Sequence, residues 1–508
     1  MKPTLVIAGP GAGKTYDMVK RIVEAIPQLD PTRVLAAITY TNAATESISS
    51  RICTVATVPP NVFVGTTYSF FNRFIIQPYA SIFDEIGVEK LFLEIDIDAL
   101  IDKRVPNKAD YAARNGLRNR LVTRFLRDGH IPVSEIGRIA ASIVQNNRRV
   151  REVLCNRLQF LFIDEFQDLD SWQFKVIDEI RKGNQTEIFV VGDPEQYISG
   201  YTYQNTTARK PKSFDGIPIQ RFSANRHHES ANFRSFEEIV RFTNRFHTEL
   251  QQESRVGSCA DAGVFFITKT DLDAIIASYR SLIGNTIWHT DNDSRPSFFY
   301  LSYENKTFGN IATKYDLTLG SSLANYSSNP FELASNLISS CIDMSTNQLK
   351  TTFGLSGLKY RELCVRLIRA VQVGSIQSEE DVMKHVSGYL NQSITVPPGT
   401  QLRNQLSQLH NFFAGLTTDS GRHQYSSIHK AKGLEAHGVL AVARTESELS
   451  AWFTTDKTKR HNDRNDRCRV GYVAFSRARQ VLCIACQKQI SENMLRYISS
   501  LEVQTLDG

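Results

Sequence analysis

The residues best suited to chemistry lie near the start of the chain, in residues 8–15, AGPGAGKT, after a short apolar run. The glycines of such a turn let successive backbone N–H groups point inward at the N-terminus of a helix, where they bind phosphate oxygens. Lys14 can reach the β- and γ-phosphates of a nucleotide, and the Thr15 hydroxyl can bind Mg²⁺. We therefore expect nucleotide phosphates to contact Gly11, Ala12, Gly13, Lys14 and Thr15.

An acidic pair follows another apolar run. Residues 160–163, FLFI, fit a buried strand, and Asp164 and Glu165 come directly after it. Both carboxylates would lie at the carboxyl edge of a parallel sheet, where open α/β sheets bind ligands. We expect Asp164 to hold Mg²⁺ through its hydration shell and Glu165 to take a proton from an attacking water.

The elements that must position these residues alternate between strands and helices. Short apolar runs predict strands at residues 5–8, 34–38, 157–163 and 187–191, and again at residues 264–267, 298–301, 438–442 and 480–485. Short buried strands that alternate with helices predict parallel sheets covered on both faces. Residues 81–150 and 315–420 lack such strands and indicate helical insertions. We therefore predict an α/β protein with two parallel-sheet units, each interrupted by a mostly helical insertion.

Composition excludes several other classes of protein. The chain has 508 residues, of which 41% are hydrophobic and 22% charged, which is typical of folded globular proteins and not of disordered or fibrous ones. It has no apolar run of about 18 residues and no apolar leader, so we expect neither a membrane span nor secretion. The eight cysteines form no disulfide framework, which favours a cytoplasmic location.

Positive charge is concentrated in one window. Residues 103–151 hold 12 Lys or Arg and only 3 acidic residues. Arg120, Arg124 and Arg127 have the spacing that places them on one face of a helix. Either this face is simply solvated, or it contacts a phosphate backbone, which the bunching of like charges slightly favours.

Seven segments resemble, in order, the motifs of the UvrD/Rep-type superfamily 1A helicases. They are TYTNAA (39–44), GTTYSF (65–70), DEFQD (164–168), VGDPEQYI (191–198), NFRS (232–235), IHKAKGLE (428–435) and YVAFSRA (472–478). The resemblance implies two RecA-like P-loop domains with ATP bound between them. It places domain 1A at 1–80 and 152–222, insertion 1B at 81–151, domain 2A at 223–314 and 421–508, and a reduced insertion 2B at 315–420.

The resemblance also implies roles for residues around the nucleotide. Arg234 and Arg477 would bring positive charge to the γ-phosphate, because a guanidinium stays charged and pairs bidentately with phosphate oxygens. Gln196 would sense the γ-phosphate and relay its state to the DNA groove. The remaining nucleoside contacts would come from Phe233 on the base, Glu435 at the ribose and Gly433 through its backbone.

Single-stranded DNA would cross the tops of both domains in this family. Hydroxyl, amide and aromatic groups suit binding without sequence preference, because they bond phosphates and stack on any base. The matching positions are Thr41, Asn42, Thr66, Tyr68, Tyr201 and His429.

The sequence also departs from the family. No counterpart of the family's adenine-reading glutamine precedes Thr4, so we expect other nucleoside triphosphates and deoxynucleotides to be accepted as well as ATP. The DNA half is diluted, with substitutions at Ala43, Tyr68, Ser199 and Thr202. The motifs therefore support ATP hydrolysis more strongly than they support robust unwinding.

Short insertions favour a narrower resemblance, to the compact GajB-type subunits of Gabija anti-phage systems. Residues 75–79, IIQPY, and the short NFR form of the arginine motif are similar to that subfamily. The resemblance implies a hetero-oligomer with a GajA-like nuclease of the OLD family, because this chain holds no nuclease constellation of its own.

Two functions stay open at this point. One is an ATP-driven motor that moves on single-stranded DNA, by family analogy 3′ to 5′; the other is a DNA-end-sensing ATPase that regulates a partner nuclease. An RNA-directed enzyme is disfavoured by the DEFQD and VGDPEQ forms. Weaker clusters are interpreted as buried thiols at Cys483 and Cys486, a polar loop at residues 227–228, and a contact with DNA or a partner at residues 460–469.

Overall fold

The computed structural model divides into two compact units. The first comprises Met1–Thr307 and Ser426–Gly508, and the second Phe308–Tyr425. The structure describes residues 2–79, 82, 92–95, 97–107, 110–198, 221–222, 225–290, 295–320, 330–342, 344, 349, 352–392, 402–403, 405–406, 409–410, 423–462 and 466–506.

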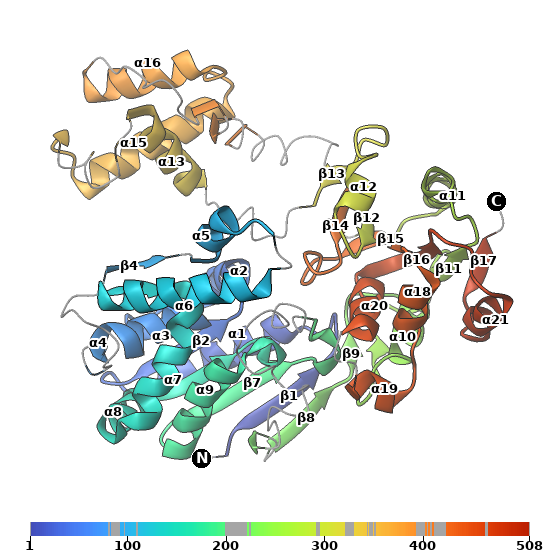
Figure 1. Cartoon of the computed structure of the whole chain (residues 1–508), viewed down its shortest axis with the longest axis horizontal. Helices are drawn as coiled ribbons and strands as arrows, with labels where there is room; N and C mark the ends of the chain where they lie inside the picture. The colour runs from blue at the N-terminus through green and yellow to red at the C-terminus, as the bar shows by residue number, and fades with distance from the viewer. Residues whose placement is uncertain are drawn as a thin grey trace. The chain divides into compact units, whose positions relative to one another are not determined.

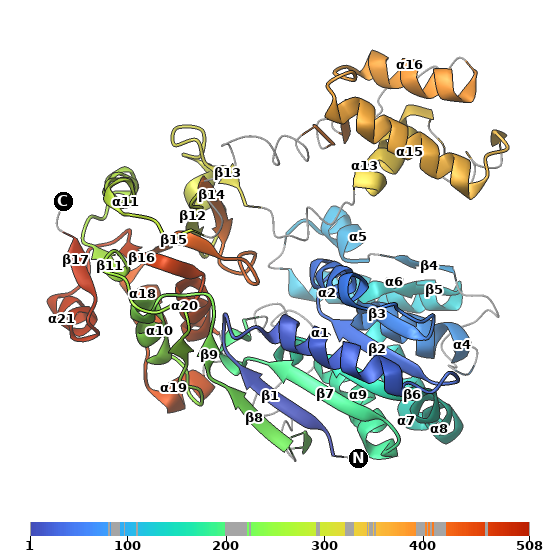
Figure 2. The same cartoon turned by 180° about the vertical axis from the view of Figure 1, so that it is seen from behind.

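The first sheet belongs to the first unit and carries the N-terminal glycine-rich loop (Figures 1 and 2). Its strand order is β3-β2-β6-β7-β1-β8, and the neighbouring strands are parallel. The strands are β1 (Thr4–Ala8), β2 (Val34–Thr39), β3 (Val62–Thr66), β6 (Leu158–Ile163), β7 (Glu187–Gly192) and β8 (Asn225–Glu229). Because they are parallel, the loop after β1 and the acidic pair after β6 leave the sheet at the same edge.

Alternate side chains of these strands enter two separate cores, as the two-residue period of a strand dictates. Leu5 and Ile7 pack with α7 (Ile136–Asn146) and α9 (Ser171–Gly183). The intervening residues of β1 pack on the opposite face with α1 (Lys14–Ala25) and α2 (Asn42–Val55). The continuous apolar runs predicted this double burial.

The second sheet also belongs to the first unit. Its strands run in the order β12-β15-β16-β11-β17, and beyond β12 the sheet continues into β14 (His423–Ser427). Neighbouring strands are again parallel. The strands are β11 (Gly263–Ile267), β12 (Phe298–Ser302), β15 (Ala436–Ala443), β16 (Ala478–Cys486) and β17 (Gln504–Leu506).

Helices cover both faces of this sheet as well. One face packs against α10 (Glu237–Asn244), α18 (Glu446–Trp452), α20 (Arg467–Phe475) and α21 (Glu492–Ser500). The aromatic ring of Tyr279, on α11 (Leu272–Asn285), meets that of Tyr300 on the other face. Two parallel, doubly covered sheets are the architecture that the strand and helix pattern predicted, and they agree with the RecA-like P-loop domains that the resemblance implied.

The segment between β3 and β6 is mostly helical in its described residues, as predicted, and it also contains two short strands. Its described residues form α5 (Ile97–Arg104), α6 (Tyr111–Arg127), α7 and α8 (Arg148–Arg157), but also β4 (Phe92–Ile95) and β5 (His130–Pro132). The two strands pair only with each other, in parallel. Strands of three or four residues outside a larger sheet are too short to show a recognisable alternation.

The second unit has its own apolar core. The helices α13 (Pro330–Ile342), α15 (Gly357–Gln372) and α16 (Glu379–Leu390) supply most of it, with Leu363 and Leu367 fully buried. A short strand, β13 (Thr318–Leu319), pairs with residues 424 and 425 of β14. Across the described residues of both units, no helix is long and apolar enough to cross a membrane.

Residues 225–229 form strand β8, whereas the sequence predicted a polar loop around His227 and His228. The strand pairs with β1 along its whole length and lies at the edge of the sheet, with both histidines exposed. An edge strand needs no apolar alternation, so its residue types gave no indication of a strand.

Candidate nucleotide and DNA site

The glycine-rich loop has the backbone form that phosphate binding requires. Gly11 and Gly13 adopt φ angles of 71° and 77°, in the left-handed region that glycine tolerates, and α1 begins directly afterwards. Lys14 Nζ donates a hydrogen bond to Ala8 O at 3.3 Å, which folds the lysine back over the loop. The N-terminus of α1, the left-handed glycines of the loop and the Lys14 ammonium group therefore lie together.

Glu165 lies between two lysines from different parts of the chain. Its Oε1 is 3.7 Å from Lys14 Nζ, and its Oε2 is 3.6 Å from Lys432 Nζ. Burial alone would raise the pKa of Glu165, but the two ammonium groups outweigh burial and hold it below its usual value. The carboxylate is thus ionised at neutral pH, as a general base must be.

The side chain of Gln167 fixes the orientation of that carboxylate. Its amide nitrogen donates to Glu165 Oε2, and its amide oxygen accepts from Asp193 N at 3.0 Å. Gln167 is fully buried. Its two hydrogen bonds connect the acidic pair after β6 to the end of β7.

Asp164 suits a divalent cation. Burial, and then the charge of Glu165, raise the pKa of its carboxyl group well above the usual value. The crowded carboxylates of Asp164 and Glu165 supply the hard oxygen donors that Mg²⁺ prefers, and Thr15, on the first turn of α1, would add a hydroxyl. A cation would offset the repulsion that shifts this pKa, so these residues fit the ion.

Asp193 collects hydrogen bonds at the end of β7. Its carboxylate accepts from Glu195 N at 2.9 Å and from Gln196 Nε2 at 2.8 Å. His247 Nε2 lies 3.1 Å from the same carboxylate, and Tyr472 donates to it at 3.5 Å. Burial opposes its ionisation, but His247 outweighs burial and lowers the pKa of Asp193 to about 2.

Gln196 and Arg477 contact each other at the centre of the first unit. Arg477 Nη2 donates to Gln196 Oε1 at 3.4 Å, and the guanidinium also donates to Val473 O at 2.9 Å and Leu434 O at 3.1 Å. Its side chain is 1% exposed. Burial and then the neighbouring Arg234 lower the pKa of Arg477 to about 9, which leaves it charged at neutral pH.

Arg234 is held beside the glycine-rich loop by Glu435. Its Nε donates to Glu435 Oε2, and Arg479 Nη2 lies 3.2 Å from the other carboxylate oxygen. Burial opposes ionisation of Glu435, but these arginines keep its pKa below the usual value. Glu435 therefore pairs with arginines in this structure, and the contact with the ribose that the resemblance implied stays a prediction.

The segment before Arg234 packs directly on the glycine-rich loop. Phe233 N donates to Gly11 O at 2.8 Å, and the exposed Phe233 ring lies over Gly13. Asn232 Nδ2 donates to Pro10 O at 3.0 Å. An exposed ring beside the phosphate loop can stack on a nucleobase, as the sequence predicted for Phe233.

Sequence reasoning missed three buried groups that complete this arrangement. Lys432 also bonds Asp168 Oδ2 at 2.5 Å, and Gln252 Nε2 donates to Pro10 O at 3.1 Å. Lys432 lies inside the motif segment IHKAKGLE, so the sequence indicated it as a candidate site residue. Nothing in the sequence indicated that it pairs with Asp168, which follows β6 of the first sheet. Gln252 and His247 lie outside the recognised motifs and have no local sequence feature that indicates a role.

Comparison with known proteins agrees with this geometry. Residues 1–202 match the family described as AAA domain. The Gabija protein GajB of Bacillus cereus (strain VD045) is 26% identical over 247 residues, which cover 48% of this chain and 46% of GajB. Rep of Escherichia coli K12, named an ATP-dependent DNA helicase, is 24% identical over 39% of this chain and 34% of Rep. This chain resembles the UvrD-like superfamily 1 helicases. It spans less than half the length of each of these curated relatives.

The threonines of the UvrD-like DNA motifs cap helices. Thr41 Oγ1 accepts from Ala44 N at the start of α2, and Thr66 Oγ1 accepts from Ser69 N at the start of α3 (Thr67–Phe71), both at 3.2 Å. Both threonines follow or end adjacent parallel strands, so they lie at the same sheet edge. Capping uses an acceptor position of each hydroxyl, while the hydroxyl of Thr41 can still donate to a phosphate.

The aromatic members of the UvrD-like DNA motifs are less uniform. Tyr68 is half-buried against the first core, and its phenol pKa is raised by burial. The His429 ring meets Tyr303 edge-on at 5.3 Å, and burial, followed by Lys432, lowers its pKa, so it is neutral at pH 7. Tyr201 and the side chain of Asn42 lie outside the described residues.

Two arginines of the cluster at residues 460–469 make buried contacts, whereas Arg467 is exposed and can still contact DNA or a partner. Arg460 Nη2 binds Glu195 Oε2 at 2.6 Å, and Arg469 Nε donates to Tyr197 O at 2.7 Å. Both side chains are buried. They attach α19 (Lys457–Asn462) and α20 to the UvrD-like motif after β7. The cysteines of β16, Cys483 and Cys486, are buried free thiols, as predicted.

Proposed function

We propose that this chain is an ATP-dependent DNA helicase or translocase of UvrD-like type. The observation that carries the proposal is the arrangement around Glu165, where Lys14 from the first sheet and Lys432 from the second flank one carboxylate. A site completed by both halves changes its contacts with each nucleotide state. Such a differential contact is what couples hydrolysis to movement of one domain against the other.

Each group has a role in hydrolysis of ATP. Backbone N–H groups of the loop and Lys14 would bind the β- and γ-phosphates, and Glu165 would accept a proton from the attacking water. Arg234 and Arg477 would stabilise charge that develops on the γ-phosphate. Thr15 and Asp164 would hold Mg²⁺, which neutralises phosphate charge when bound.

Movement on DNA would follow from the Gln196–Arg477 contact. Gln196 lies in the short turn Pro194–Gln196 after β7, and Thr41 and Thr66 of the UvrD-like DNA motifs lie at the same edge of the first sheet. Loss of the γ-phosphate would remove a partner of both side chains and alter how the halves meet. We propose 3′ to 5′ movement on single-stranded DNA, bound by Thr41, Asn42, Thr66, Tyr68, Tyr201 and His429, with domains 1A, 1B, 2A and 2B divided as the motifs predict.

The cellular role we propose is that of the helicase-like subunit of a Gabija anti-phage complex. Similarity to GajB over about half of this chain supports it. A GajA-like nuclease of the OLD family would then be the partner. The substitutions Tyr68 and Ala43 in the DNA motifs favour a second candidate, an ATPase that senses DNA ends and regulates that nuclease with little unwinding of its own.

Strand displacement distinguishes the two candidates. The purified chain is incubated with ATP, Mg²⁺ and duplexes that carry a 3′ tail, a 5′ tail or no tail, with Glu165→Gln as the control for hydrolysis. Displacement of the 3′-tailed strand by the chain alone supports the motor. Hydrolysis that DNA stimulates without strand displacement supports the regulatory ATPase. A hydrolysis rate that DNA leaves unchanged contradicts both candidates.

A further inference from the structure

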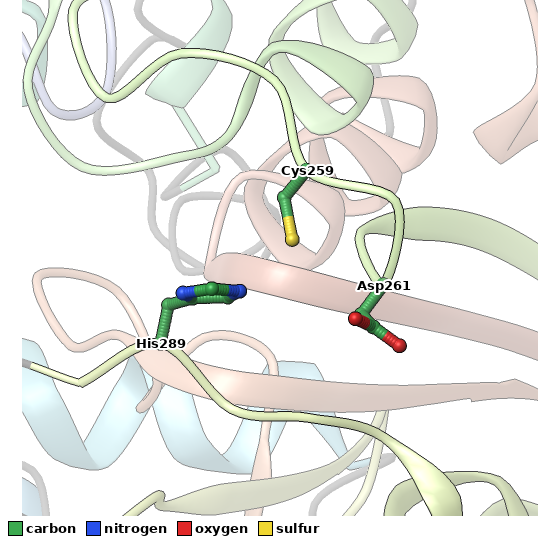
Figure 3. Close-up of side chains that lie close together, drawn as sticks. All are labelled: Cys259, Asp261 and His289. Carbon is green, nitrogen blue, oxygen red and sulfur yellow. The ribbon is translucent and has the colours of Figure 1, made fainter.

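A second cluster of ligand-type side chains lies in the first unit, outside the nucleotide site. Cys259, Asp261 and His289 each direct one donor atom toward a common centre, and these atoms lie within 4.8 Å of one another. Figure 3 shows the thiol, the carboxylate and the imidazole converging from two facing backbone segments. Cys259 and Asp261 are partly buried and His289 is exposed, so a small ion can enter from solvent.

The backbone on both sides of this cluster is fixed. Gln480, fully buried at the start of β16, accepts from His289 N at 3.0 Å and donates to Ile287 O at 2.7 Å. The His289 ring meets the Phe236 ring at 5.7 Å. On the other side, Ala262 N donates to Cys259 O at 3.0 Å, which closes a turn that places residues 259 and 261 side by side.

A neighbouring carboxylate, that of Glu238, has one satisfied and one unsatisfied oxygen among the described residues. Glu238 Oε1 accepts hydrogen bonds from Ser258 Oγ and from Cys259 N at 3.4 Å. Its other oxygen, Oε2, is buried and has no hydrogen-bond partner among the described residues. A buried, unsatisfied carboxylate oxygen is costly, and a cation close to it would offset that cost.

We propose that Cys259, Asp261 and His289 bind Zn²⁺. Thiolate sulfur, imidazole nitrogen and carboxylate oxygen are the three donor types that Zn²⁺ takes, and the softer sulfur and nitrogen donors disfavour Mg²⁺ and Ca²⁺. Tetrahedral donors about 2.0–2.3 Å from Zn²⁺ lie about 3.3–3.8 Å apart, so the side chains need to close only slightly. Water would take the fourth position.

The site would brace the segment that carries the arginines of the nucleotide site. Phe236 N donates to Arg479 O at 2.9 Å, and Ser235 Oγ donates to Ala478 O at 2.7 Å. Gln480 continues the same segment and holds His289. Bound Zn²⁺ would join the loops at residues 259–261 and 287–289 across this segment, and so act as a positioning element, without contact to the nucleotide.

Metal content tests the proposal directly. The full chain is purified without chelator or metal-affinity resin, dialysed against Zn²⁺, and assayed for bound zinc by mass spectrometry. We expect about one equivalent in the wild type, and a loss of most of it in Cys259→Ala and in His289→Ala. The matched controls Cys53→Ala and His228→Ala change an exposed cysteine and an exposed histidine elsewhere and should retain the zinc.

Co²⁺ supplies a second measurement that is independent of stoichiometry. Substituted at this site, it should give a thiolate charge-transfer band and the intense d–d bands of a tetrahedral ion, both absent in Cys259→Ala. If Cys259→Ala fails to fold by circular dichroism, Asp261→Asn and the exposed His289→Ala decide the matter. Wild-type chain free of zinc, or zinc retained equally by the cluster and control variants, would overturn the site.

Discussion

Arg460 and Glu195 form a buried ion pair that joins α19 of the second sheet to the end of β7 in the first. Nε and Nη2 of the guanidinium lie 3.0 and 2.6 Å from the same carboxylate oxygen. The side chains are 1% and 4% exposed. Because Gln196 is the next residue after Glu195, this pair also holds the segment that carries Gln196 against the opposite half.

Removing one partner of this pair should be costly. Arg460→Met leaves the Glu195 carboxylate buried and unpaired, so we expect a loss of about 3–5 kcal/mol in the free energy of unfolding. Urea unfolding measures it. The exposed pair Arg496–Glu492 is the control, and Arg496→Met should change stability little. If the double variant Arg460→Met/Glu195→Gln were no more stable than Arg460→Met, the unpaired charge would not be the cause.

Substitutions of Lys14 and Glu165 should impair nucleotide hydrolysis in different ways. Lys14→Ala removes a ground-state phosphate contact, so both nucleotide binding and turnover should fall. Glu165→Gln keeps the shape but removes the base, so nucleotide should bind while kcat falls by roughly 10²–10⁴-fold. Fluorescent-nucleotide titration and a phosphate-release assay separate the two. Wild-type turnover by Glu165→Gln would exclude Glu165 as the base.

Gly11→Ala should abolish hydrolysis through the backbone. A Cβ at this position would lie 2.6 Å from Arg234 Cβ and from Asn232 Oδ1, and the φ of 71° costs a non-glycine residue about 1–2 kcal/mol. The loop would move away from the arginine segment, and nucleotide affinity should drop. Gly284→Ala on α11, where a Cβ meets nothing within 4 Å, is the control and should preserve activity. Equal activity of the two variants would contradict the close packing.

The basic face of α6 should make DNA binding sensitive to salt. Arg120, Arg124 and Arg127 line one shallow hollow, and Arg124 has only a loose pair with Asp128 at 3.8 Å. Changing all three to Glu should weaken binding to every sequence and reduce the slope of log affinity against log salt by roughly 2. The same charge change at exposed sites elsewhere is the control, at Lys20, Arg361 and Arg496. An unchanged slope would mean that the face is only solvated.

Asp193 should contribute stability that acid removes. Its pKa is lowered from 3.8 to about 2 in the folded chain, because His247 outweighs burial. A carboxyl with a depressed folded pKa stabilises fully above its unfolded value and loses that contribution as the pH falls through the folded value. The stability difference between wild type and Asp193→Asn should therefore be constant near pH 6 and shrink between pH 4 and pH 2. A difference that does not shrink would mean that ionisation of Asp193 does not stabilise the fold.

Elements that follow from a local residue pattern could be predicted from the sequence. Apolar runs such as residues 160–163 are buried on both faces of a parallel sheet. The strand predicted at residues 157–163 is observed at Leu158–Ile163. The loop at residues 8–15 needs glycine for its left-handed backbone angles and lysine for its positive charge, so its conformation could also be predicted. Strand β8 was not, because an edge strand with exposed polar side chains obeys no apolar rule.

The ion pairs between residues far apart in the sequence follow from the tertiary structure and could not be predicted from local patterns. Lys432 meets Glu165 and Asp168 from more than 260 residues away, and Arg460 meets Glu195 at a similar separation. Nothing local marks such pairs, since a buried and a solvated arginine look alike in sequence, and the fold alone sets which side chains lose water together. The zinc-type cluster has the same origin: Cys259 and His289 are ordinary residues of two loops until Gln480 holds one loop opposite the other.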